Sequence, residues 1–321
     1  MKFSFSLESV NMLTSGPNFI YKQSKGFWVN YFKYIAAAGF KAVELPFNPF
    51  SSDPMAFETG RCGIPCNATA INSKYGSPSE FRAFLKDVGI DDISSIHVNA
   101  NNAMLEVVAA KLPAQNYYTL FEDMVQQAIE HCKSLDCRAL IISPSPELGW
   151  IKALLPEDVD SRFEETTVEI LRRQCGRADK EGIQIAVTSE FWSLFRGEGI
   201  LRLADKVPGL KLCPDPAHIR IAGLNEVDVL GSFGGNILCP RLTDTDFTDE
   251  YRNFERINAE IPVEGRQKVF SDLGDGNVDL LEFARTIKAS GYNGYIVCEQ
   301  RKTLDVYRGL LKLRWFLDHE I

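Results

Sequence analysis

The chain has 321 residues, of which 45% are hydrophobic and 24% charged, and its formal net charge is −8. This is the composition of a globular protein with a sizeable core, and no stretch reaches the ~20 uninterrupted apolar residues of a membrane span. The acidic balance argues against binding to nucleic acid or to a membrane, since both partners need clustered lysine and arginine.

The N-terminal segment MKFSFSLESVNML lacks a sustained apolar stretch with a small-residue cleavage site, so we interpret it as a first strand and expect a cytoplasmic protein. Several of the eight cysteines lie inside apolar or helical runs, which is typical of reduced thiols. Cys62 and Cys66 have a spacing seen in zinc sites, but no second pair follows them, so a structural metal is not favoured there.

Short apolar runs alternate with amphipathic helical patterns along the chain. Strands are predicted at 3–7, 41–45, 93–99, 138–143, 183–189, 210–213, 236–242 and 295–299. Helices are predicted at 27–38, 79–89, 117–135, 156–180, 278–291 and 303–320. The stretch 46–78, rich in proline, glycine and serine, is predicted to be a long loop.

Strands that alternate with helices are parallel, because only a crossover helix returns the chain to the same edge of a sheet. We therefore predict an α/β fold, a single (β/α)8 TIM barrel over residues 1–321 with an extended loop after strand 2. An open doubly wound sheet is the alternative, but no GxGxxG follows the first strand. A long loop on the catalytic face of a barrel is typical of a lid or a subunit contact.

Three carboxylates follow predicted strands: Glu190 after IQIAVTS, Asp215 after LKLCP, and Glu299 after YIVC. In a parallel barrel such side chains share one mouth. Three like-charge pairs at roughly 4 Å and an effective dielectric constant near 20 would cost on the order of 12 kcal/mol. A bound divalent cation is the simplest relief, because hard oxygen ligands suit Mg²⁺ or Mn²⁺.

The chain resembles the xylose isomerase-like TIM-barrel superfamily of sugar isomerases, epimerases and related dehydratases and lyases. The resemblance covers most of the chain and is carried by AAAGFKAVEL (36–45), PDPAHIRIAG (214–223) and LGDGNVDLLEFARTIKASGYNGYIVCEQ (273–300).

Metal-dependent members of this superfamily bind the cation through Glu, Asp, His and Glu at the ends of strands five to eight. The resemblance implies that Glu190, Asp215 and Glu299 are ligands of Mn²⁺ or Mg²⁺, but Arg241 occupies the position of the histidine. An arginine cannot ligate a cation, because its guanidinium keeps its proton in proteins. Either the carboxylates with water or Cys239 still bind the metal, or Arg241 supplies the positive charge and the site works without metal or not at all.

Glu190 and Glu299 are the predicted catalytic pair, one removing a proton beside a carbonyl group and the other returning it. Such a reaction also needs an electrophile for the developing enediolate oxygen, and a metal or Arg241 can serve. The alternative is that each glutamate merely begins a loop.

Four further side chains are candidates for contact with the substrate. The resemblance implies that His218 contacts substrate hydroxyls and that Glu44 borders the pocket; the alternatives are a helix-start histidine bonded to the backbone and a carboxylate that caps a loop. His97 is expected to face the mouth or to be structural, and Trp192 is expected to form an apolar wall or to pack in a lid.

The resulting hypothesis is a metal-assisted isomerase or epimerase of a sugar, keto-sugar or inositol derivative that works through an enediolate. The alternatives are a lyase or dehydratase, for example one that cleaves a 3-keto C-glycoside with a small partner subunit, and a non-catalytic sugar-binding barrel that has lost the metal histidine. We expect a small-molecule carbohydrate as ligand and a homo-oligomer, with the aromatic-rich 17–35 and 46–78 segments as candidate contact surfaces.

Overall fold

The computed structural model describes residues 1–10, 24–50, 64–159, 161–263, 268–301, 303 and 305–321. Its strands form one parallel, eight-stranded sheet with the order β6-β5-β4-β3-β2-β1-β8-β7. The strands are β1 (Lys2–Ser6), β2 (Ala42–Phe47), β3 (Asp92–Asn99), β4 (Ala139–Ser143), β5 (Gln184–Thr188), β6 (Lys211–Cys213), β7 (Arg241–Leu242) and β8 (Tyr295–Cys298).

The two ends of this sheet approach one another and nearly close a barrel. Leu212 on β6 pairs with Ile237 in a parallel bridge, and the Arg241 amide donates to the Pro214 carbonyl at 2.9 Å. The predicted (β/α)8 barrel is thereby confirmed, and its strands run in the predicted chain order.

The seventh strand is much shorter than the predicted 236–242. Cys239 has a φ of 46°, in the left-handed region, so the extended backbone is interrupted before β7 begins at Arg241. Periodicity of apolar residues cannot reveal such a break, because the side chains on either side of it remain buried.

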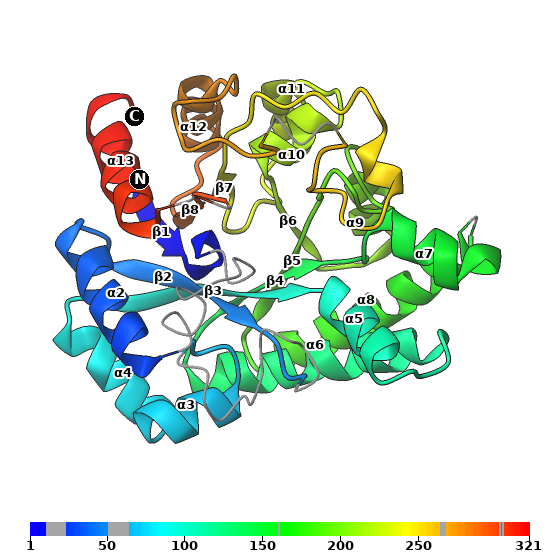
Figure 1. The fold of residues 1–321 in the computed structure, drawn as a ribbon, viewed down its shortest axis with the longest axis horizontal. Helices are drawn as coiled ribbons and strands as arrows, with labels where there is room; N and C mark the ends of the chain where they lie inside the picture. Colours follow the sequence, from blue (N-terminus) through cyan, green and yellow to red (C-terminus); the bar gives the residue numbers. More distant parts are fainter. Residues whose placement is uncertain (11–23, 51–63, 160, 264–267, 302, 304) are drawn as a thin grey trace.

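Helices surround the strands (Figure 1). They are α2 (Lys25–Ala37), α3 (Ala68–Tyr75), α4 (Pro78–Asp87), α5 (Asn101–Ala109), α6 (Asn116–Ser134), α7 (Leu148–Leu154), α8 (Arg162–Lys180), α9 (Gly199–Lys206), α10 (Pro216–Ile221), α11 (Glu226–Ser232), α12 (Leu280–Ala289) and α13 (Val306–His319). Short 3₁₀ turns lie at Leu7–Ser9 (η1), Pro156–Asp158 (η2) and Asn253–Glu255 (η3). None of the helices in these described ranges is long and apolar enough to cross a membrane.

The segment predicted as one long loop after β2 contains the helix α3. Asn67 begins it, because its side-chain oxygen accepts a hydrogen bond from the Ala70 amide at 2.8 Å. Residues 51–63, which include Cys62, lie outside the described residues. Cys66 is buried, and the described cysteines are free thiols, as expected.

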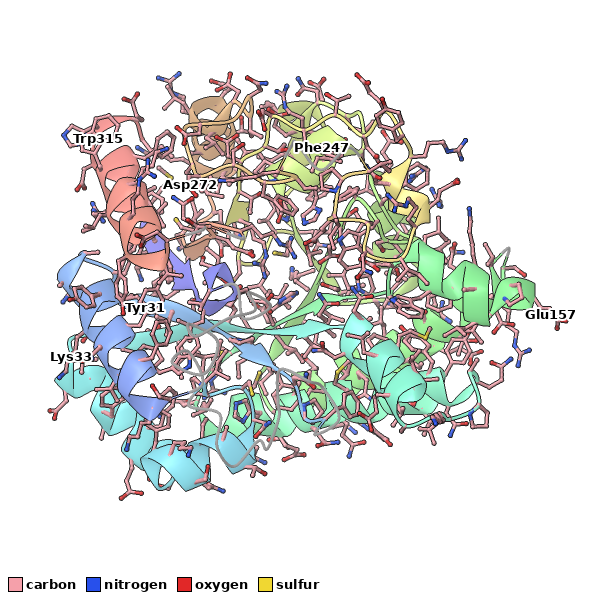
Figure 2. All side chains as sticks on the ribbon, viewed as in Figure 1. Tyr31, Lys33, Glu157, Phe247, Asp272 and Trp315 are labelled. Atoms are coloured by element: carbon pink, nitrogen blue, oxygen red, sulfur yellow. The ribbon has the colours of Figure 1, made fainter. Side chains whose placement is uncertain are left out.

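Aromatic side chains of α2 join the start of the chain to its end. The Tyr31 hydroxyl donates to the Val306 carbonyl at 3.3 Å, and its ring lies 5.7 Å from that of Tyr307 on α13. Phe27 and Trp28 are also buried, so most aromatic residues in the described part of the 17–35 segment belong to the core. Figure 2 shows Tyr31 inside the molecule and Trp315 of α13 at its outer edge.

Candidate active site

The three predicted carboxylates lie at the carboxyl end of the barrel. Glu190 and Asp215 each follow a strand by two residues, and Glu299 directly follows β8. Each is at most 2% exposed. The guanidinium of Arg301 interacts electrostatically with all three, so they form one charged centre.

Arg241 lies between two buried carboxylates of this centre. Its Nη1 donates to Glu299 Oε2, and its Nη2 lies 2.9 Å from Glu44 Oε1. Glu44 also accepts hydrogen bonds from Ser6 at 2.9 Å and Ser95 at 2.8 Å. Glu44 is therefore the counter-ion of Arg241 in the barrel interior. It is not among the residues that line the cavity of about 310 Å³ beside this centre.

Arg301, three residues after β8, is a second cation that the sequence analysis missed. Its Nε lies 3.4 Å from Glu299 Oε1, and its Nη2 lies 3.7 Å from Glu260 Oε1. The guanidinium also packs 4.9 Å from the centroid of the Phe270 ring. Like Glu299, Arg301 lies just after the end of β8. Its position after a predicted strand is therefore the signal by which the sequence could have identified it.

Glu190 is the last member of a chain of hydrogen bonds. Its Oε1 accepts from the Ser143 hydroxyl, whose oxygen lies 3.0 Å from His97 Nε2. His97 Nδ1 lies 2.8 Å from Glu8 Oε1. Since Ser143 donates to Glu190, it accepts from His97, and both ring nitrogens of His97 act as donors.

The pKa values of this chain follow from burial and charge. Burial alone would lower the pKa of His97, but the Glu8 carboxylate raises it above its ordinary value. Burial would raise the pKa of Glu8, yet the charge and hydrogen bond of His97 lower it to about 2. Burial raises the pKa of Glu190 to about 7, even though the Ser143 hydrogen bond opposes this shift. The charged Glu8–His97 pair is therefore linked through Ser143 to Glu190, whose carboxyl group titrates near neutral pH.

His218 is fully buried beside Asp215. Burial lowers its pKa to about 4, so the ring is neutral. Nδ1 accepts from the Phe191 amide at 3.0 Å, so Nε2 carries the proton and contacts Arg301 Nη1. The imidazole therefore lies directly against the Arg301 guanidinium, between it and the Phe191 amide.

Three carboxylate oxygens of the site make no hydrogen bond to any described residue: Glu190 Oε2, Asp215 Oδ2 and Glu299 Oε1. The other Asp215 oxygen accepts from the Thr243 hydroxyl and from the His218 amide. Buried polar atoms without hydrogen bonds are costly, and they are common where a ligand binds.

A cavity of about 310 Å³ opens beside this centre, near the lower end of the range of roughly 300–1,000 Å³ for small-molecule sites. Glu8, Glu299 and Arg301 lie on its charged side, whereas the buried Glu190, Asp215 and His218 are not among the residues that line it. Its walls combine apolar and amide groups: Val10, Leu105, Trp150, Trp192, Ile261, Asn99, Asn101 and Asn258, together with Glu147 and Glu260. Trp192 donates from Nε1 to Glu260 Oε1 at 2.9 Å, which holds the indole at the wall.

The expected divalent cation does not fit this arrangement. No three His, Cys, Asp or Glu side chains of the described ranges are arranged to bind a metal, because Arg241 and Arg301 lie among the acids. A divalent ion about 4 Å from one guanidinium would be repelled by about 8 kcal/mol at an effective dielectric constant near 20, so each nearby arginine cancels the attraction of one carboxylate at that distance. Cys239, the alternative ligand, lies with its sulfur 3.6 Å from the Ser94 carbonyl in the barrel interior.

Residues 32–316 match the family model described as xylose isomerase-like TIM barrel. The chain therefore belongs to the xylose isomerase-like TIM barrel family. No curated protein matches the sequence.

Solved structures share the fold at low sequence identity. A D-allulose 3-epimerase from Methylomonas sp. has a TM-score of 0.65 at 14% identity, covering 100% of this chain and 98% of its own. The probable 3-DHS dehydratase AsbF from Bacillus anthracis has a TM-score of 0.65 at 13% identity, covering 100% of both chains. A xylose isomerase-like TIM barrel protein from Mycobacterium smegmatis, in complex with magnesium, has a TM-score of 0.62 at 15% identity, covering 98% of this chain and 95% of its own.

A longer protein contains the same fold. A xylose isomerase-like TIM barrel/4-hydroxyphenylpyruvate dioxygenase fusion protein has a TM-score of 0.60 at 16% identity and covers 98% of this chain. The present chain spans only 41% of the length of that fusion protein.

Proposed function

We propose that this protein is an isomerase or epimerase of a small neutral carbohydrate, such as a sugar, keto-sugar or inositol derivative, that removes a proton from one carbon atom and returns a proton to the same carbon or to its neighbour. The observation that carries the proposal is Glu190, a buried carboxyl group with a pKa of about 7 and with one oxygen that makes no hydrogen bond to any residue that the structure describes. A base that is half ionised near neutral pH is well suited to proton abstraction. Family membership and the fold of the epimerase relative agree with this chemistry.

In the proposed reaction Glu190 removes a proton from a carbon beside a carbonyl group. The bonding electrons move to the carbonyl oxygen, which becomes an enediolate oxygen next to the positive charge of the site. Glu299 returns a proton to carbon; burial raises its pKa, although Arg301 and Arg241 oppose this shift. No step is assigned to a divalent metal, because the arranged residues do not fit one.

The walls of the cavity suit a polyhydroxylated substrate. Asn99, Asn101 and Asn258 present amide groups, and Trp150 and Trp192 present apolar faces. Combined aromatic and amide walls are a common way to bind a small polar molecule. Within this proposal the expected contact of His218 with substrate is indirect, through Arg301, whereas His97 supports Glu190 through Ser143.

Proton exchange with solvent tests the function directly. The protein is incubated in D₂O with a panel of ketoses, keto-sugars and inosose-type ketones, and deuterium incorporation is followed by NMR. We expect exchange by the parent protein and a loss of roughly 10²–10⁴-fold in Glu190→Gln, because the general base is removed. Glu165→Gln, on the exposed face of α8, is the matched control and should retain full activity.

Exchange by Glu190→Gln at the parental rate would refute the assigned base. Absence of exchange by the parent protein across the panel would instead favour a non-catalytic sugar-binding barrel.

A lyase or dehydratase is the second candidate, and the fold shared with a probable dehydratase favours considering it. The same base would form the same enediolate, but a β-substituent would then leave. Release of water or of an aglycone in the exchange experiment distinguishes this reaction from isomerisation. A small partner subunit that co-purifies would support the lyase, and light scattering would test the expected homo-oligomer.

A further inference from the structure

We infer that two arginines, Arg241 and Arg301, replace the divalent cation in this site, and that Arg301 is the group that binds the reacting substrate oxygen. Both guanidinium groups lie among the acids of this chain that correspond to the expected metal ligands of metal-dependent relatives. The replacement of the metal is inferred from the contacts of the two arginines with the acids, whereas the catalytic role of Arg301 rests on the proposed function.

Arg241 provides the fixed, inner positive charge. It is 2% exposed and lies between Glu44 and Glu299, so these two acids of the interior share its single positive charge. The hydrogen bonds from Ser6 and Ser95 hold Glu44 in place. Because Arg241 is enclosed in this way, it supports the centre but does not reach the cavity.

Arg301 provides the outer positive charge and does line the cavity. Its side chain is 11% exposed, and it lies within ion-pair distance of Glu299 and Glu260. Glu190 and Asp215 also interact with it, and each of these two acids has one oxygen without a hydrogen-bond partner in the described ranges. The Arg301 guanidinium therefore occupies the position among these carboxylates that a shared cation would take.

The guanidinium of Arg301 has donors for a ligand on its cavity side. Its Nη1 is in direct contact with His218 Nε2, which leaves no room for an oxygen between them. The guanidinium also lines the cavity, so an incoming carbonyl or enediolate oxygen would accept from its remaining N–H groups. Stabilisation of such an oxygen by a preorganised guanidinium requires no Lewis acid.

Metal binding is measured on the intact protein first, without any assumption about its reaction. The protein is purified in the presence of Mn²⁺, dialysed, and analysed for bound metals; its thermal midpoint is then recorded with Mn²⁺, with Mg²⁺ and with EDTA. We expect far less than one equivalent of any divalent ion and the same midpoint in all three conditions. One tightly bound ion per chain, or a midpoint that rises with Mn²⁺ and falls with EDTA, would overturn the inference.

The role of Arg301 is measured by chemical rescue in the D₂O exchange assay. Arg301→Ala should lose at least a hundredfold in exchange rate and regain part of it with added guanidinium ions, while Mn²⁺ has no effect. Arg308→Ala, on the exposed face of α13, is the control and should behave as the parent. Urea at the same concentration controls for denaturation by guanidinium.

Rescue of Arg301→Ala by Mn²⁺ instead of guanidinium would overturn the assignment. An unchanged exchange rate in this variant would do the same. If the parent protein catalyses no exchange, the proposed function fails, but the metal measurements still decide whether arginines have replaced the ion.

Discussion

At the scale of single residues, the burial of Glu190 lowers the stability of the folded protein when this carboxyl is ionised. Its pKa is about 7, compared with an ordinary value of 4.5. Ionising this carboxyl therefore costs about 3 kcal/mol more in the folded protein than in water. The shift is caused by burial, and the Ser143 hydrogen bond only partly offsets it. Carboxyl groups with strongly raised pKa values concentrate at functional sites.

The pH dependence of catalysis should report this group. A general base acts in its deprotonated form, so kcat/KM should rise with pH and level off above about 7. The Ser143 hydrogen bond stabilises the charged form of Glu190, so Ser143→Ala should shift this rise to higher pH. A pH–rate profile of the parent and variant provides the measurement.

Ser145→Ala is the matched control, because Ser145 is buried nearby but hydrogen-bonds Ser193 and the Leu194 amide instead. A profile that shifts equally in both serine variants, or in neither, would contradict the assignment of this pKa to Glu190.

At the scale of elements, the loop after β7 is shaped by one carboxylate. Asp244 accepts hydrogen bonds from the amides of Gly274, Gly276, Val278 and Thr245. A methyl group on Gly276 would lie 2.2 Å from Asp244 Oδ1 and 2.6 Å from the Thr245 nitrogen. Only glycine allows this close approach. The loop then leads into α12, whose first turn is capped by the Asp279 side chain.

Replacement of this glycine should therefore destabilise the protein. We expect Gly276→Ala to lower the free energy of unfolding by roughly 1–3 kcal/mol, because the added methyl overpacks the loop. Gly176→Ala, in the interior of α8 with no atom within 4 Å of the new methyl, should instead raise it by about 0.5–1 kcal/mol. Urea denaturation of the two variants measures both effects, and a stabilising Gly276→Ala would refute the proposed role of the loop.

At the scale of the whole molecule, the last helix ties the end of the chain to its beginning. β1 pairs with both β2 and β8, and α13 packs its buried face, including Leu310 and Leu313, into the main hydrophobic core. Tyr31 of α2 bonds to the first residue of α13. Closure of the barrel, and with it the shared mouth, therefore involves both ends of the chain.

Shortening a side chain on the buried face of α13 should lower the free energy of unfolding of the whole protein. Leu313 is fully buried, so Leu313→Ala should lower the free energy of unfolding by roughly 2–5 kcal/mol through lost contacts and a cavity. Leu311 is 65% exposed on the same helix, so Leu311→Ala should change it by less than about 0.5 kcal/mol. Chemical denaturation followed by circular dichroism compares the two, and equal effects would contradict this packing.

The sequence by itself determined the barrel and the strand ends on which the carboxylates lie. Alternation of short apolar runs with amphipathic helices is a local pattern, and eight such units leave few arrangements that bury every strand. Glu190, Asp215 and Glu299 lie within two residues of the ends of their strands, so their position at the mouth depends mainly on chain direction. The helix α3 and the break at Cys239 were missed, because a single cap and a single left-handed residue are weak signals within one segment.

Only the tertiary structure decided what the carboxylates contact. Arg241 bonds Glu299 across 58 positions, and Ser143 bonds Glu190 across 47. Such pairs depend on strand register and on the side-chain directions of distant segments, which no local pattern contains. The position of Arg301 among three acids likewise became visible only in the closed barrel, because its partners come from loops after different strands.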